Sequence, residues 1–282
     1  AIYPSLAVSQ IRPNTACVIN QGTGMHFDGS NDWIALPQKY TNPLNSFTAE
    51  CWFKTDDNRG NWTANWALID FDRSEYYNVF VRQDGRLGFS SRLGGTFLDL
   101  VGSTANLNDG EWHHVAAVYD GTDKIIYLDG VEDNRHVNAH SGQGIGLGKQ
   151  DRYGFLGDGS EASRFNGARN GMIYGGAIDE VRIWNTARTP AEIQENLNQV
   201  VAPSSAGLWA YYRLDEGVSE TNNTGLGNTI IDSGPNGFNG TLVNSAKRGP
   251  LSNWVEGTIV TEALGDGIGS AIVTEDGIIY DG

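Results

Sequence analysis

Residues 111–132 read EWHHVAAVYDGTDKIIYLDGVE, and this stretch decides the fold of the chain. From Val115 to Asp120, successive side chains divide between two faces with the period of two that a β-strand requires. Asp120-Gly121 interrupts that run, and a second apolar run follows from Lys124 to Leu128. Asp129-Gly130 closes it, and Asp-Gly between apolar runs favours a hairpin turn with positive φ at both central residues. The stretch therefore predicts antiparallel strands that follow one another along the chain.

The composition of this 282-residue chain is typical of a globular β-protein. Apolar residues make up 39% of the chain and aromatic residues 10%, enough for a sizeable core. The 37 glycines favour short strands joined by tight turns. The net charge of −15 argues against a nucleic acid or an anionic membrane surface as partner. No run of about 20 apolar residues is present, so the sequence predicts no transmembrane helix.

The two ends and the two cysteines carry further expectations. The chain begins Ala-Ile-Tyr-Pro, without a methionine or the apolar stretch of a signal peptide, and it ends in a strand-like run, Ala271–Tyr280. We therefore expect a processed protein or part of a longer multidomain chain. A disulfide between Cys17 and Cys51 and a buried free thiol at Cys51 are both compatible with the sequence.

Apolar runs separated by turn residues recur along the chain at the spacing of a β-sandwich. One helix is expected late in the chain. Residues 189–192, Thr-Pro-Ala-Glu, combine a capping box with proline at the first helical position, and an apolar stripe starts at Ile193. Pro203 ends this segment, and we expect the helix to cover the sandwich rather than to hold a cofactor.

Five segments together carry a resemblance to a known family. They are Met25–Ile34, Phe47–Phe53, Glu111–Asp120 with Ile126–Gly130, Ile178–Asn185 running into Thr189–Ile193, and Leu208–Gly217. The sequence resembles the laminin G-like jelly rolls of the concanavalin A-like lectin/glucanase superfamily, of the secreted bacterial and pentraxin-like type. The resemblance implies an all-β fold, a two-sheet antiparallel jelly-roll sandwich with one concave and one convex sheet and one short helix in its C-terminal half.

The resemblance spans residues 22–257, which we expect to form the jelly roll. Residues 1–21 would then be an N-terminal extension, and residues 258–282 an acidic, glycine-rich tail or the start of a following module. Loops at the rim of the concave sheet usually hold any ligand in this superfamily.

The resemblance also implies one structural calcium ion, Ca2+, on the convex side. The candidate ligands are Asp28, Gly29, Asn31 and Asp32, in a tight turn, and Asp179, in the strand pattern Ile178–Trp184. Calcium takes six to eight oxygen ligands from carboxylates, amides and carbonyls, and this turn offers them. Alternatively, these side chains accept hydrogen bonds from local backbone N–H groups and only stabilise turns.

A ligand site is expected around the loop Asp70–Tyr77, because in pentraxin-like relatives a loop in this region and a later loop that follows a Leu-Gly pair together bind calcium and ligand. In this chain the later loop starts at Leu147-Gly148, and Lys149 stands where a carboxylate would help. Exposed aromatic rings beside an acidic rim suit stacking on sugars, although packing beneath loops and a solvated polar rim explain the same residues. The candidate ligand-binding residues are Asp70, Asp72, Glu75, Trp62, Trp66, Tyr76, Asp151 and Tyr153.

An enzymatic interpretation rests on Asp70-x-Asp72-x-x-Glu75. Retaining glucanases of the superfamily carry Glu-x-Asp-x-x-Glu on one strand, and their two catalytic carboxyl groups stand about 5–5.5 Å apart. The first carboxylate here is an aspartate, one methylene shorter. His113 and His114 point to opposite faces of a strand and are expected to be structural.

The sequence therefore favours a non-catalytic binding or adhesion module with structural calcium, from a secreted or cell-surface protein. Its partner would be a carbohydrate, a cell-surface glycoconjugate or a surface protein. Two alternatives stay open at this point. One is a glycoside hydrolase or polysaccharide lyase on the same fold, and the other is a ligand-free spacer domain of a large adhesin.

Overall fold

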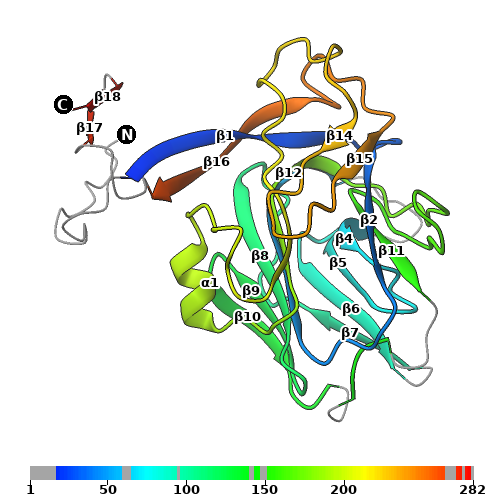
Figure 1. Cartoon of the computed structure of the whole chain (residues 1–282). Helices are drawn as coiled ribbons and strands as arrows, with labels where there is room; N and C mark the ends of the chain where they lie inside the picture. The colour runs from blue at the N-terminus through cyan, green and yellow to red at the C-terminus, as the bar shows by residue number, and fades with distance from the viewer. Residues whose placement is uncertain are drawn as a thin grey trace.

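The protein is a two-sheet antiparallel sandwich with a single short helix in the part of the chain that the structure describes (Figure 1). The structure is a computed structural model. It describes residues 17–58, 65–93, 96–139, 143–146, 151–263, 271–274 and 277–280. Both principal sheets have eight strands, which confirms the all-β sandwich predicted from the sequence.

The first sheet contains residues 111–132 at one of its edges. In sheet order, its strands are β10 (Val131–His136), β9 (Lys124–Leu128), β8 (Trp112–Tyr119), β3 (Phe47–Lys54), β12 (Gly175–Trp184), β1 (Cys17–Asp28) and β16 (Trp254–Ala263), with β13 (Leu208–Tyr212) paired to β12. Strands β1 and β16 continue together beyond the sandwich as a two-stranded ribbon (Figure 1).

The second sheet faces the first across the core. In sheet order, its strands are β14 (Thr229–Ile230), β15 (Gly240–Val243), β2 (Trp33–Tyr40), β11 (Arg152–Leu156), β4 (Asn65–Asp70), β5 (Tyr77–Arg82), β6 (Leu87–Leu93) and β7 (Thr96–Val101). Strands β17 (Ala271–Thr274) and β18 (Gly277–Tyr280) pair separately with each other.

The hairpin predicted at Asp129-Gly130 forms between β9 and β10, where Val131 pairs with Leu128. Asp129 has φ 48° and Gly130 has φ 78°, the positive values that a type I′ turn needs. The alternation of side chains predicted from Val115 to Asp120 is also observed, on strand β8. Side chains on one face of β8 enter the main core between the sheets, and Ala116 and Val118 on the other face pack beneath the helix.

The helix α1 (Pro190–Asn196) covers the outer face of the first sheet, as expected. Its capping box is formed by the Thr189 and Glu192 side chains, and Ile193 is its buried anchor. Beneath it, the buried guanidinium of Arg182 donates to the carbonyls of Asn196 and Gln199, both at 2.9 Å. A cation at the C-terminal end of a helix is favourable, because the last carbonyls lack partners within the helix.

The outer face of the second sheet is covered over only part of its width. Residues 157–174, which connect β11 to β12, pack on Trp33, Ala35 and Phe155 of β2 and β11 through Ala162. Strands β4 to β7 carry a hollow instead, described below. The outer face of the second sheet therefore carries a candidate site.

Two further predictions from the sequence concern a transmembrane helix and the two cysteines. No helix in the described ranges is long and apolar enough to cross a membrane. Cys51 is a free, fully buried thiol, and the side chain of Cys17 is not among those described.

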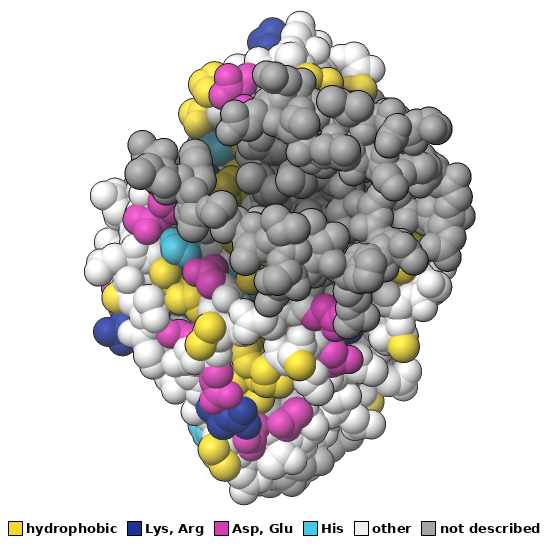
Figure 2. Space-filling model, turned by 90° about the vertical axis from the view of Figure 1, so that its left-hand side faces the viewer, with side chains coloured by type: hydrophobic (Ala, Val, Ile, Leu, Met, Phe, Trp, Pro, Cys, Tyr) yellow, Lys and Arg dark blue, Asp and Glu magenta, His cyan; other side chains and the backbone are white. Residues whose placement is uncertain are grey.

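The described part of the face in Figure 2 shows acidic side chains scattered among polar and apolar ones, which agrees with the net charge of −15.

Candidate functional site

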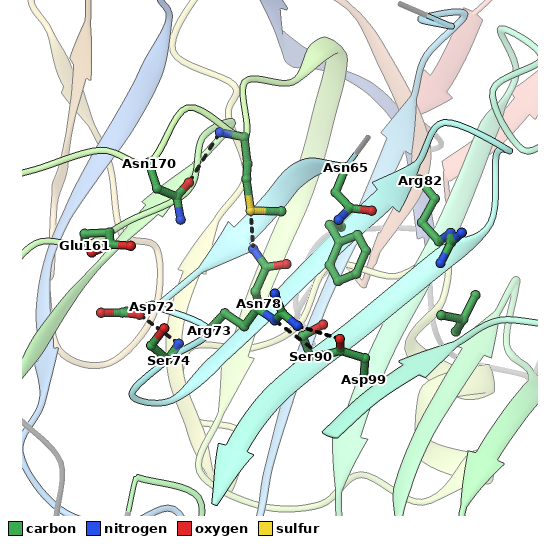
Figure 3. A pocket seen from close by; sticks show the side chains of 13 residues that line it. Asn65, Asp72, Arg73, Ser74, Asn78, Arg82, Ser90, Asp99, Glu161 and Asn170 are labelled. Atoms are coloured by element: carbon green, nitrogen blue, oxygen red, sulfur yellow. Dashed lines mark hydrogen bonds and ion pairs between the residues drawn. The ribbon is translucent and has the colours of Figure 1, made fainter. Parts of the chain in front are cut away.

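A cleft of about 360 Å³ lies on the outer face of the second sheet, across strands β4 to β7 (Figure 3). Its floor comes from side chains two residues apart on β5, namely Asn78, Phe80 and Arg82. Residues at this spacing point to the same face of a strand, so the strand alternation places all three in the cleft. The remaining lining residues are Asn65, Ser90, Asp99 and Val101 on the neighbouring strands, residues 72–74 of the β4–β5 turn, and Glu161, Asn170 and Met172 of the β11–β12 connection.

Phe80 forms the apolar bottom of the cleft, and its ring is only 4% exposed, so it shapes the cleft rather than offering a face to a ligand. Its ring lies over Gly88 of β6, where a Cβ atom would collide with the ring carbons. Met172 packs beside the ring together with Ala67, and the Met172 carbonyl accepts the Ala67 N–H at 2.8 Å. The absence of a side chain at Gly88 therefore lets the ring lie flat on the sheet.

Asn78 links the cleft to a buried carboxyl group below it. The Asn78 amide donates to Asp70 Oδ2, while Asn78 Oδ1 is buried with no hydrogen-bond partner in the described structure. Burial, followed by the nearby Asp72 carboxylate, raises the pKa of Asp70 well above its ordinary value. Asp70 is fully buried, so it supports Asn78 rather than facing a ligand.

Most charged groups at the cleft are already paired within the protein. Arg73 donates to both oxygens of Asp99, at 3.3 and 2.6 Å, and Arg82 contacts Asp84 at 3.3 Å. The Asp72 carboxylate accepts from Arg152 Nε at 2.5 Å. The remaining uncharged polar groups are the amides and hydroxyls that suit a polyhydroxylated ligand.

The wall formed by residues 157–174 is held by specific contacts. Arg169 donates to the fully buried carboxylate of Asp158 at 2.5 Å, and its guanidinium stacks 3.9 Å from the centre of the Trp33 ring. The Trp33 indole donates to Asn166 at 3.0 Å. These contacts fix the segment that carries Glu161 and Asn170, so the wall is preorganised.

The residues predicted to bind ligand do not gather at one place. Asp72 lines the cleft. Trp66 and Tyr76 are each 1% exposed and belong to the main core, so neither ring is free to stack on a sugar. Asp151 pairs with Lys39 at 2.8 Å, and Tyr153 packs against Phe165. Trp62 lies outside the described residues.

The carboxylates of the enzymatic alternative do not lie along one strand. Asp70 ends β4, while Asp72, with φ 64°, and Glu75 lie in the following turn. The Asp72 carbonyl accepts the N–H groups of Glu75 and Tyr76, at 2.9 and 2.7 Å. Arg152 contacts the carboxylates of both Asp72 and Glu75. The single-strand arrangement of the retaining glucanases is therefore not formed.

The structure also separates the two parts of the predicted calcium site. Asp28 pairs with Gly175 and Met25 with Ile178, so Asp179 lies opposite Gly24, about 13 Å from Asp28 along β1. Asp179 instead accepts from the backbone and hydroxyl of Thr258, at 2.7 and 3.0 Å. One ion cannot be held by both parts.

In the turn at residues 28–32, only some of the candidate oxygen ligands remain available for a cation. Asp28 Oδ1 accepts the N–H groups of Ser30 and Asn31, while the exposed Asn31 side chain and the Gly29 backbone lie beside it. Asp32 is fully buried, and its Oδ1 accepts no hydrogen bond from the residues that the structure describes. No group of three His, Cys, Asp or Glu side chains that could hold a metal occurs among the described residues. Calcium at this turn stays a prediction.

Sequence reasoning did not find the cleft, although one signal for it was present. Asn78-x-Phe80-x-Arg82 alternates with the inward-facing Val79 and Val81, and polar residues around an aromatic residue on the outward face mark an unusual surface. The wall could not be recognised, because residues 157–174 show no strand or helix periodicity.

Comparison with known families agrees with this geometry. The laminin G model described as the concanavalin A-like lectin/glucanases superfamily matches residues 28–194. The chain belongs to this superfamily. The matched range contains every element that lines the cleft, so the cleft is part of the superfamily domain.

A solved structure shows the same fold. A protein from Bacteroides ovatus ATCC 8483, named as a candidate carbohydrate-binding protein, has a TM-score of 0.59 and 21% identity, covering 88% of this chain and 61% of its own. A heptameric SAP-like pentraxin from Limulus polyphemus has a TM-score of 0.47 and 14% identity, covering 62% of this chain and 82% of its own. No curated protein matches the sequence.

Proposed function

We propose that this chain is a non-catalytic carbohydrate-binding module of an extracellular protein, and that the cleft over β4 to β7 holds the glycan. The observation that carries the proposal is a preorganised cleft lined by the partly exposed amides of Asn65 and Asn170. The fold alone does not decide the matter, because this superfamily hosts many functions.

The chemistry of the cleft matches that of a sugar. The hydroxyls of a sugar both donate and accept hydrogen bonds, as the partly exposed amides of Asn65 and Asn170 do. The volume of about 360 Å³ lies within the range of small-molecule sites. The name of the Bacteroides ovatus protein supports this ligand class.

A glycan array followed by calorimetric titration tests the proposal on the whole chain. The Asn65→Ala and Asn170→Ala variants should each weaken binding to the best glycan about tenfold, because each removes a hydrogen-bonding amide from the cleft. Asn236→Ala is the matched control, since the Asn236 amide donates to the Trp209 carbonyl outside the cleft. Binding that survives both cleft variants would place the site elsewhere. Silence of the folded protein on every glycan would favour the ligand-free spacer.

A further inference from the structure

The charged side chains around the cleft are unequal in sign, and this imbalance bears on which sugars the cleft can bind. Three carboxylates and two guanidiniums line it. Both lining guanidiniums contact carboxylates of the protein, Arg73 through two hydrogen bonds to Asp99 and Arg82 through Asp84. A site for anionic ligands normally offers guanidinium or ammonium groups whose donors are free to form bidentate contacts.

Glu161 is the exception among these charged groups. Its side chain is exposed at the cleft wall and makes no ion pair within the described part of the chain. Its backbone N–H donates to the Ala168 carbonyl at 3.0 Å, which fixes its position on the wall. In Figure 3, Glu161 and Asp72 lie at one end of the cleft and Arg82 at the other. An anionic ligand would therefore meet an uncompensated carboxylate.

The charged groups at the Arg82 end of the cleft do not offset the excess of carboxylates. Arg82 and Arg86 share Asp84 and have side chains that are 41% and 44% exposed, so water and salt screen them. The Arg152 guanidinium is divided between Asp72 and Glu75. With these partners included, carboxylates outnumber guanidiniums by five to four.

We infer that the cleft selects uncharged glycans and rejects those with carboxylate or sulfate groups, and that Glu161 is the residue that determines this selectivity. The inference rests on the proposed function. The net charge of the whole chain, −15, adds a longer-range repulsion that weakens as salt is raised.

The test uses glycans in matched pairs, each neutral oligosaccharide beside the uronate or sulfate form of the same backbone. The wild-type chain should bind the neutral member more tightly, with a preference that shrinks as sodium chloride is added. Glu161→Gln should raise the affinity for the acidic member relative to its neutral partner about threefold, the size expected for one exposed charge pair.

Glu195→Gln is the charge-matched control, because Glu195 lies exposed on α1 over the opposite sheet and the substitution changes the net charge by the same amount. The control should not alter the preference. Equal or tighter binding of acidic glycans by the wild type would overturn the inference, as would an effect of Glu195→Gln equal to that of Glu161→Gln. Failure to bind either member of any pair would instead refute the proposed function.

Discussion

The most direct test of the sandwich structure concerns the side chain of Lys124. It is fully buried, and its Nζ donates to the Phe89 carbonyl at 2.8 Å, to Ser91 Oγ at 2.9 Å and to the Leu98 carbonyl at 2.5 Å. The ammonium therefore reaches from β9 in the first sheet to β6 and β7 in the second. It forms no ion pair among the described residues. Burial lowers the pKa of Lys124 from 10.5 to about 7, although Asp99 opposes the shift.

This lowered pKa has a definite sign for stability. Between pH 7 and pH 10.5 the unfolded chain keeps the proton on Lys124 while the folded protein loses it, so raising the pH favours the folded state. The coupling of Lys124 protonation to folding lowers the free energy of unfolding by about 4 kcal/mol at pH 7 and by about 1.5 kcal/mol at pH 9.5. Both figures are relative to a pH at which Lys124 is uncharged in the folded and unfolded chain. Lys124 should therefore contribute a gain of about 3 kcal/mol over this interval.

The measurement compares urea denaturation of the wild type and Lys124→Met at pH 7, 8, 9 and 9.5. Methionine fills the same apolar space without titrating, so the difference between the two proteins isolates Lys124 from other titrations. We expect the difference in unfolding free energy to move in favour of the wild type as the pH rises. A difference that stays constant between pH 7 and 9.5 would refute the assignment of a buried, desolvated ammonium. Lys39→Met is the control, because Lys39 is exposed and paired with Asp151, and its difference should stay flat.

Four further predictions follow from the same structure. Burial lowers the pKa of His114 to about 4, so wild-type stability should fall by about 2 kcal/mol relative to His114→Gln between pH 8 and pH 5, measured by denaturation at each pH. Gly88→Ala should displace the Phe80 ring and lower the melting temperature measured by calorimetry, because a Cβ atom at Gly88 would collide with the ring carbons. Thr189→Ala removes the capping box and should cost about 1 kcal/mol in urea denaturation with unchanged glycan binding. Excess calcium should raise the melting temperature in the wild type but not in Asp32→Asn, and no effect of calcium against chelator would remove the calcium prediction.

The sequence by itself determined the features that depend on near neighbours in the chain. The alternation around Val115 and the Asp129-Gly130 turn specify an antiparallel hairpin, because side-chain period and turn geometry act over a few residues. The capping box at Thr189 and Glu192 works for the same reason. These local signals, in their order, were enough to recognise the superfamily and its sandwich.

Only the tertiary structure decided which face could bind. Trp66 and Tyr76 looked like exposed loop aromatics, yet both lie in the core. Strand pairing between β4 and β5 places Trp66 there, and the β4–β5 turn packs Tyr76 against Tyr40. Strand register likewise separates Asp28 from Asp179. The cleft needs Phe80 to lie over Gly88 of a neighbouring strand and a wall from residues 157–174, which arrive from elsewhere in the chain. Such contacts depend on which strands become neighbours, and that outcome is set by burial of the whole core rather than by any local pattern.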